Sequence, residues 1–245
     1  GQIDHVLRKA VGSGLDPVRA VQMATLHPAR HYNLRGLGGI APGYQADLLV
    51  VGDLSRFQIE LVFKAGKLAA RQGRYLWLQT GKHAESASNT VHLPELQGRL
   101  SLEKPAQNAG ARVIEVQPEQ ILTKCLIIPA AEIDASDELA RVAVVERHGK
   151  NGNIAVGLVK GFGRLKGALA STVAHDSHNL ILVGTDTQDM ELAARTVAAA
   201  GGGLAVVSEG RVLASLALPV AGLMSNEDAD TVSRLHEELH RAAQR

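Results

Sequence analysis

The sequence of 245 residues is poor in the residue types on which several classes of protein depend. It contains one cysteine, Cys125, so it forms no internal disulfide and no zinc site built from several cysteines. Aromatic residues make up 3% of the chain, too few for the stacking platforms that bind single-stranded nucleic acid. The formal net charge is +1, so the bulk charge favours neither nucleic acid nor a membrane surface as a partner. No apolar run reaches the roughly 18 residues of a membrane-spanning helix, and no signal peptide opens the sequence.

The single cysteine lies in the apolar run 121–128, and this context predicts a buried thiol that acts as a small hydrophobic side chain. A chain without disulfides favours a reducing compartment, and we expect a cytoplasmic protein. The hydrophobic fraction of 45% and the charged fraction of 21% are typical of a globular protein with one large domain or two smaller ones. Because Gly1 is not a natural initiator and the sequence opens as if within a domain, we expect a fragment.

The first part of the chain, residues 1–34, is predicted to be helical. Apolar residues recur at helical spacing, and a glycine-containing break is expected at 12–14. A second helix begins with Asp16 as N-cap and Pro17 as its first residue. The pair 27–28, His-Pro, is expected to end it.

The remaining sequence divides into three segments with different hydrophobic patterns. Residues 35–79 predict a small β unit, with strands near 48–51, 59–64, 67–71 and 74–78. Residues 80–110 are polar and without a clear period, which indicates either a linker or a long extended crossing. Residues 111–245 alternate strand and helix. Strands are expected near 112–117, 122–128, 141–146, 154–160, 168–174, 180–184, 204–208 and 211–217, and helices at 186–200 and from 225 onward. The fold class is therefore α/β, or α+β overall.

The run 174–179, AHDSHN, places two imidazoles, a carboxylate, a hydroxyl and an amide between two apolar segments. Its candidate catalytic residues are His175, Asp176 and His178, in a rim or positioning role. Three interpretations stay open: a hydrogen-bond network that positions the loop, a contact to substrate, or a local metal site. Histidines three apart on a loop, with only Asp176 as a third donor, disfavour the metal site.

A second polar run, residues 146–153 with the sequence ERHGKNGN, lies a short way upstream. A glycine-spaced basic loop can cradle an anion, and the alternative is a solvated turn. The candidate substrate-binding residues of the two runs are Arg147, His148, Asn151 and Asn179. No metal ligand is assigned to this chain.

Residues 39–51 have the form G-x-I-x-P-G-x-x-A-D-L-x-V. Pro42-Gly43 favours a tight turn with a positive φ at the glycine, and Asp47 can accept hydrogen bonds from turn amides, so a purely structural turn accounts for the motif by itself. The pattern also resembles the amidohydrolase superfamily, as do residues 24–30 (ATLHPAR) and 62–67 (VFKAGK). That resemblance implies the end of a (β/α)₈ barrel followed by a small β-sandwich.

The rest of the chain resembles the C-terminal domain of the adenine deaminases within that superfamily. The resemblance rests on residues 146–153, 157–163 and 167–179, and on the opening run 1–8, in which Gln2 stands where His is more usual. It implies four parts. These are the last helices of a truncated barrel at 1–34, a β-sandwich domain at 35–79, a linker or crossing at 80–110, and a mixed α/β domain at 111–245 that is itself truncated.

The resemblance further implies metal-dependent hydrolysis of adenine to hypoxanthine and ammonia, with a binuclear Mn or Fe centre in the full-length protein. The superfamily's His-x-His metal motif is absent from this sequence, and the expected barrel Asp would lie just before Gly1. The fragment alone is therefore expected to be inactive. The single cysteine also excludes the zinc site of the cytidine-deaminase type.

Two functions from different classes follow. The first is the C-terminal part of an adenine deaminase, with adenine as substrate of the parent enzyme. The second is a non-catalytic binding or assembly module of amidohydrolase origin. A related amidohydrolase that acts on another cyclic amide or amidine fits residues 1–75 but fits 146–179 poorly. Neither nucleic acid nor membrane is expected as a partner, and apolar side chains such as Ile3 and Val18, which lack barrel strands to cover them, predict a homo-oligomer.

Overall fold

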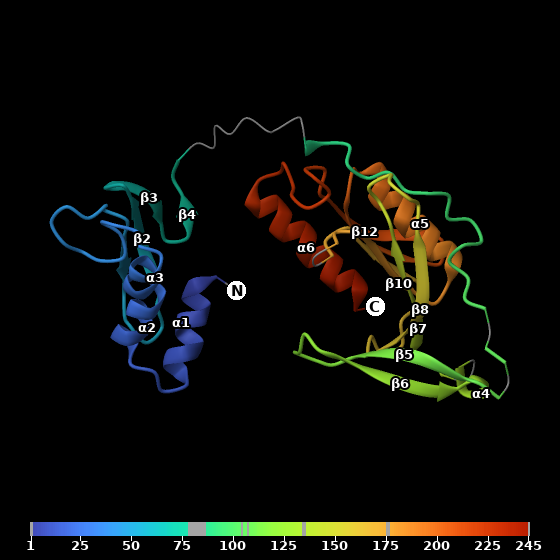
Figure 1. Ribbon diagram of the computed structural model, residues 1–245. Helices are drawn as coiled ribbons and strands as arrows, with labels where there is room; N and C mark the ends of the chain where they lie inside the picture. The colour runs from blue at the N-terminus through green and yellow to red at the C-terminus, as the bar shows by residue number, and fades with distance from the viewer. Residues whose placement is uncertain are drawn as a thin grey trace. The chain divides into compact units, whose positions relative to one another are not determined.

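The computed structural model describes residues 2–77, 87–103, 105–106, 108–133, 136–174 and 177–244. The chain divides into two compact units, residues 1–81 and 82–245 (Figure 1). Each is described by itself. Among the described residues, no helix has both the length and the apolar character needed to cross a membrane.

The first unit begins with three short helices, α1 (Ile3–Gly12), α2 (Pro17–Ala24) and α3 (Leu26–His31). Asp16 caps α2 by accepting a hydrogen bond from the Arg19 amide, as predicted. The expectation that His27 and Pro28 end this helix is wrong, because α2 stops at Ala24 and both residues lie in α3. Pro28 is tolerated there because it sits in the first helical turn, where the backbone N–H groups lack helical partners.

A four-stranded antiparallel sheet completes the first unit, in the order β1-β2-β3-β4. Its strands are β1 (Leu48–Val51), β2 (Ile59–Lys64), β3 (Lys67–Arg71) and β4 (Arg74–Tyr75). The predicted turn chemistry is confirmed, since Gly43 has φ 84° and Asp47 accepts a hydrogen bond from the Ala65 amide. The α+β class is also confirmed, whereas the sandwich and the barrel origin of the helices stay predictions.

The second unit is built on one eight-stranded sheet in the order β12-β11-β9-β10-β7-β8-β5-β6. Its strands are β5 (Gly110–Val116), β6 (Thr123–Pro129), β7 (Leu139–Val145), β8 (Ile154–Lys160), β9 (Ala168–Ser171), β10 (Leu180–Gly184), β11 (Gly203–Ser208) and β12 (Arg211–Ala217). Only the β5–β8 pair is parallel among these described strands. Apolar runs placed all eight strands to within a few residues.

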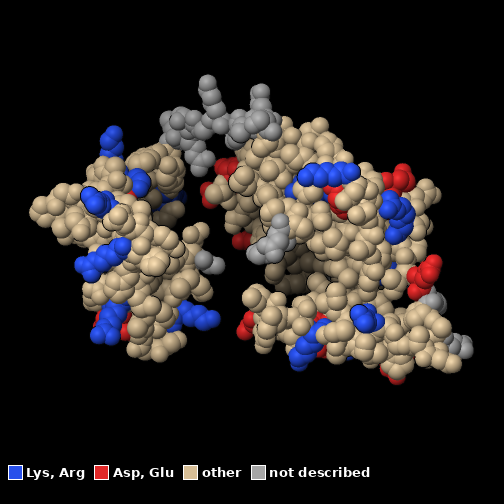
Figure 2. Space-filling model, in the orientation of Figure 1, with Lys and Arg blue, Asp and Glu red and all other residues tan. Residues whose placement is uncertain are grey.

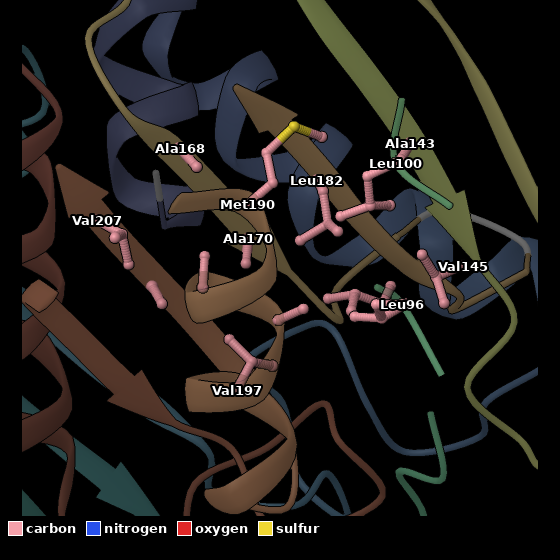
Figure 3. Close-up of a cluster of buried hydrophobic side chains, with 14 residues drawn as sticks. Leu96, Leu100, Ala143, Val145, Ala168, Ala170, Leu182, Met190, Val197 and Val207 are labelled. Carbon is pink, nitrogen blue, oxygen red and sulfur yellow. The ribbon is translucent and has the colours of Figure 1, made fainter. Parts of the chain in front are cut away.

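The main core lies on the sheet face covered by helix α5 (Thr187–Ala199) (Figure 3). Leu182 of β10, Ala143 of β7 and Ala205 of β11 share this face, and Met190 of α5 packs on them. The segment 87–103 crosses the same face in an extended form and buries Leu96 and Leu100 in the core. The described residues 87–103 thus belong to the second unit, and the choice between a linker and an extended crossing for residues 80–110 stays a prediction.

Helix α6 (Ala229–Ala243) covers part of the opposite face, over β11 and β12 (Figure 1). Its Leu239 packs with Val206 and Leu216. A short helix, α4 (Ala130–Ile133), follows β6. Cationic and anionic side chains are interspersed over the visible face of this unit (Figure 2).

The prediction of a buried Cys125 is wrong, because the thiol is exposed. Cys125 lies on the edge strand β6, opposite Ile114 in the register of β5. Side chains alternate along a strand, so Leu126 and Ile128 pack inward while Cys125 and Ile127 point to the other face. An apolar run on an edge strand therefore buries only every second residue.

Candidate functional site

The two polar runs singled out in the sequence meet at one end of the eight-stranded sheet. Val145, the last residue of β7, pairs with Leu180, the first residue of the antiparallel β10, so the loops 146–153 and 174–179 adjoin the same end of the sheet. Segment 87–92 joins them, because the His92 amide donates to the carbonyl of Arg147 at 2.7 Å. We refer to residues 87–92, 146–153, 172–174, 177–179 and 220–224 as the loop cluster.

Arg147 lies at the centre of the loop cluster. Its side chain is 1% exposed, and it was expected to bind substrate. Its Nε donates to the carbonyl of His178, its Nη1 to that of Thr90 at 3.3 Å and its Nη2 to that of Ala221 at 3.0 Å. Burial lowers the pKa of Arg147, but a guanidinium stays protonated near neutral pH. In this structure Arg147 fastens three segments to one another and does not present its charge to solvent.

The backbone amides of loop 146–153 bind an anion from within the loop itself, the carboxylate of its first residue, Glu146. Glu146 is 8% exposed, and its Oε1 accepts from the His148 amide at 2.6 Å. Its Oε2 accepts from the amides of Lys150, Asn151 and Gly152 at 3.1 to 3.2 Å. Sequence reasoning missed this role, although an acidic residue directly before a glycine-spaced loop was the available signal.

Replacement of Glu146 by glutamine is expected to destabilise the second unit in a pH-dependent way. Burial by itself raises the pKa of Glu146, but the backbone donors Gly152, Asn151, His148 and Lys150 outweigh it, so the pKa lies below the ordinary value of 4.5. A lowered folded-state pKa gives stability that is fully present above 4.5 and is lost as the pH falls through the folded-state value.

Thermal unfolding between pH 7 and pH 3 tests this expectation. The wild type and Glu146→Gln should differ most at pH 7, and the difference should shrink as the pH falls below 4.5 and through the lower folded-state pKa, where the carboxyl of Glu146 becomes protonated. The exposed Glu227, replaced by Gln, serves as the control and should follow the wild type. A gap that stays constant down to pH 3 would show that the charge of Glu146 has no part in the loop.

His148 and Asn151, two further predicted substrate-binding residues, are exposed. The Nε2 of His148 lies 3.2 Å from the carbonyl of Ser177, which links the two polar runs directly. Asn151 accepts a hydrogen bond from the Asn153 amide at 2.9 Å, a local turn contact. The backbone N–H of the half-buried Asn179 donates a hydrogen bond to Ser177 Oγ at 3.4 Å. Each of these three residues makes its own hydrogen bond, and none of these bonds joins two of the three to each other.

His178 is the candidate catalytic residue that the structure describes, since His175 and Asp176 lie outside the described residues. Its backbone is left-handed, with φ 48°. Two hydrogen bonds hold this conformation: the backbone amide of His178 donates to the Ala174 carbonyl at 3.0 Å, and Arg147 donates to the carbonyl of His178. Its Nδ1 is buried and has no hydrogen-bond partner among the described residues. A buried ring nitrogen without a partner is uncommon in a folded protein.

Thr172 ties the cluster to the neighbouring strands. This fully buried hydroxyl accepts from the Gly203 amide at 2.8 Å and donates to the carbonyl of Gly222 at 2.6 Å. Sequence reasoning missed it, because a threonine within the apolar run 168–174 was taken as one more strand residue. The same loop, 220–224, supplies the Ala221 carbonyl to Arg147, so both buried polar side chains hold one segment.

The described residues do not provide the binuclear metal centre implied by the amidohydrolase resemblance. Within the ranges that the structure describes, no group of three or more His, Cys, Asp or Glu side chains is placed to hold a metal ion. We therefore derive no catalytic step through a metal from this chain.

Comparison with known proteins supports the resemblance inferred from the sequence. Residues 120–245 match the family described as adenine deaminase C-terminal domain, and residues 3–69 match the amidohydrolase family. The chain is 43% identical over 247 residues to "Adenine deaminase 2" of Carboxydothermus hydrogenoformans, covering 98% of this chain and 43% of that protein. It is 45% identical over 238 residues to "Adenine deaminase" of Oleidesulfovibrio alaskensis, covering 95% and 41%. It thus spans less than half the length of these relatives. With more than half of its residues matched to one family, the chain belongs to the adenine deaminase C-terminal domain family.

Proposed function

We propose that this chain is the C-terminal portion of an adenine deaminase, an enzyme that hydrolyses adenine to hypoxanthine and ammonia. The observation that carries the proposal is the alignment of nearly the whole chain with proteins named adenine deaminase at 43% and 45% identity. In this reaction water supplies the oxygen at C6 of the purine, and the exocyclic amine leaves as ammonia. Because the chain covers only about two fifths of these relatives, the activity belongs to the whole parent protein.

The metal centre of the parent protein lies, in this proposal, in the part of the relatives that this chain does not cover. Manganese or iron is the metal expected from the superfamily resemblance. The resemblance also gives adenine as the substrate. The homo-oligomeric state and the cytoplasmic localisation stay predictions. In the first unit, which matches the amidohydrolase family at 3–69, the helices of residues 1–34 would belong to the end of the catalytic barrel and residues 35–79 to the β-sandwich domain.

The loop cluster is proposed to form part of the rim of the adenine site. The unpartnered Nδ1 of His178 supports this role, because an incoming polar group would satisfy it. His148 and Asn151 are exposed in the same cluster, and the buried Arg147 and Glu146 hold its loops through hydrogen bonds to the backbone. Asn179 is proposed for the same rim, and the roles predicted for His175 and Asp176, which lie outside the described residues, stay predictions.

Ammonia release from adenine tests the proposal. The parent protein that includes the upstream sequence is expected to deaminate adenine when loaded with Mn²⁺ or Fe²⁺, and this chain alone is expected to be inactive. In the parent, His178→Ala should lower turnover without changing the thermal midpoint, and the exposed His236→Ala on α6, outside the loop cluster, is the control that should leave turnover unchanged. An inactive parent, loaded with either metal, would favour the binding or assembly module instead. Activity in this chain alone would contradict the absence of a metal centre.

A further inference from the structure

Two histidines stand one helical turn apart on α6, away from the loop cluster. His236 and His240 occupy positions i and i+4, so their side chains project from the same face of the helix. Their rings are nearly parallel, at an interplanar angle of 26°, with centroids 6.1 Å apart. Both are exposed, and neither imidazole ring makes a hydrogen bond or an ion pair with another residue in the described part of the chain.

We propose that His236 and His240 form a two-histidine binding site for a late first-row divalent transition metal, such as Cu²⁺, Ni²⁺ or Zn²⁺. This inference rests on α6 alone and does not depend on the proposed function. Neutral imidazole is a preferred ligand of these metals. Alkaline-earth ions, which prefer oxygen ligands, would not select this pair.

Coordination of one metal by both rings requires each side chain to rotate, because the lone pair of a ring nitrogen lies in the ring plane and the two planes are nearly parallel. Two imidazoles on one metal at the usual Zn–N distance of about 2.0–2.1 Å have ring centroids roughly 5 Å apart. The observed separation of 6.1 Å is therefore about 1 Å too long, and exposed side chains close that gap by rotation about χ1 and χ2. No backbone change is needed, since the helix already fixes the spacing.

The surroundings leave coordination positions open. Both rings border a groove of about 320 Å³ along α6, which is lined mainly by apolar side chains such as Phe162, Ile181 and Leu239. The adjacent Glu237 is paired with Arg241 at 3.3 Å, so its carboxylate is already engaged. Gln244, one further turn along, borders the same edge of the helix. Two protein ligands with the other positions open to water or a small ligand make an exchangeable site rather than a closed structural one.

A second pair with the same spacing, His27 and His31, provides a matched comparison. It lies on α3, which has six residues and contains Pro28, and the His31 ring packs edge-on against Tyr32 at 4.9 Å. That aromatic contact holds one ring in place, so this pair is less free to converge on a metal. Comparison of two double variants, His236→Ala/His240→Ala and His27→Ala/His31→Ala, therefore distinguishes metal binding at the α6 pair from unspecific binding to any exposed histidine pair.

The test is titration of the whole chain with each metal chloride alone, by calorimetry, with electron paramagnetic resonance for the Cu²⁺ sample. One Cu²⁺ per chain should bind most tightly, Ni²⁺ and Zn²⁺ more weakly, and Mg²⁺ and Ca²⁺ not measurably. Loss of one outer-shell partner already weakens metal sites by about 10–100-fold, so removal of either ligand should weaken Cu²⁺ binding by roughly tenfold or more. The Cu²⁺ spectrum should show nitrogen hyperfine coupling.

The proposal is overturned if the α6 double variant keeps the affinity of the wild type, or if the α3 variant alone loses it. Comparable binding of Mg²⁺ would also overturn it, because that result indicates carboxylate ligands. Circular dichroism of the α6 double variant should match the wild type, since both side chains are exposed. Added Zn²⁺ should raise the thermal midpoint of the wild type and leave that of the α6 double variant unchanged.

Discussion

The variant Arg147→Ala is expected to be about 3–5 kcal/mol less stable than the wild type, because a fully buried carbonyl left without a donor costs roughly 1–3 kcal/mol and the three contacts of Arg147 are part-buried, which places the sum at the lower end. Three carbonyls lose their donor at once, those of Thr90, His178 and Ala221. The residue is almost fully buried, so water does not easily replace the guanidinium. Lysine is a poor substitute at this site, since one ammonium does not reproduce the planar fork that reaches three segments.

The measurement must separate the two units. The single tryptophan, Trp77, belongs to the first unit, so its fluorescence reports on that unit alone. Hydrogen exchange of the amides of β10, next to the His178 loop, reports on the second. Arg147→Ala should accelerate exchange in β10 and leave the fluorescence transition in place.

Arg141 provides the matched control. It is half-buried in the same sheet, and its Nη1 donates to one carbonyl, that of Thr185, at 2.7 Å. Arg141→Ala should cost about 1 kcal/mol, the typical net value of a single hydrogen bond. If both variants were equally mild, the three-carbonyl contact of Arg147 would have no special energetic role.

Arg147 also shows what the sequence was able to predict and what it was not. Polar loop sequence and glycine spacing identified 146–153 as a loop next to a strand, and apolar runs located β7 and β10 on either side. A basic residue within such a loop gives no local sign that it is buried. Its partners Thr90 and Ala221 lie 57 and 74 residues away, so only the tertiary fold brings them together.

The same limit explains the errors at Cys125 and at Pro28. An apolar run predicts a strand, but whether the strand lies at the edge of a sheet depends on the order β5-β6, which local sequence does not encode. A proline predicts a helix boundary, but not whether the boundary precedes or follows it within the first turn. Local periodicity thus located the elements, and the long-range contacts decided which side chains are buried.

The second large effect is expected at Gly222, which lies against Arg147. Its φ is 69°, and a Cβ added there would lie 2.6 Å from Arg147 Nη1. A guanidinium normally moves aside, but this one is held by three carbonyls and enclosed by protein. Gly222→Ala should therefore cost about 1–2 kcal/mol for the left-handed backbone and roughly 1–3 kcal/mol more for overpacking.

Gly210, in the turn between β11 and β12, isolates the backbone contribution. It has nearly the same φ, 71°, and no atom lies within 4 Å of the position of an added Cβ. Gly210→Ala should therefore cost only about 1–2 kcal/mol. The excess of Gly222→Ala over Gly210→Ala measures the contact with Arg147.

A double-mutant cycle then identifies the clashing partner. In the background of Arg147→Ala the overpacking at Gly222 has no partner, so Gly222→Ala should cost no more than Gly210→Ala. The two substitutions would then be less than additive in the free energy of unfolding, as measured by hydrogen exchange of β10. Strict additivity would mean that the cost at Gly222 comes from its backbone alone. Because this guanidinium and the Thr172 hydroxyl both connect loop 220–224 to the rest of the loop cluster, strong coupling would also show that the proposed rim is held as one unit.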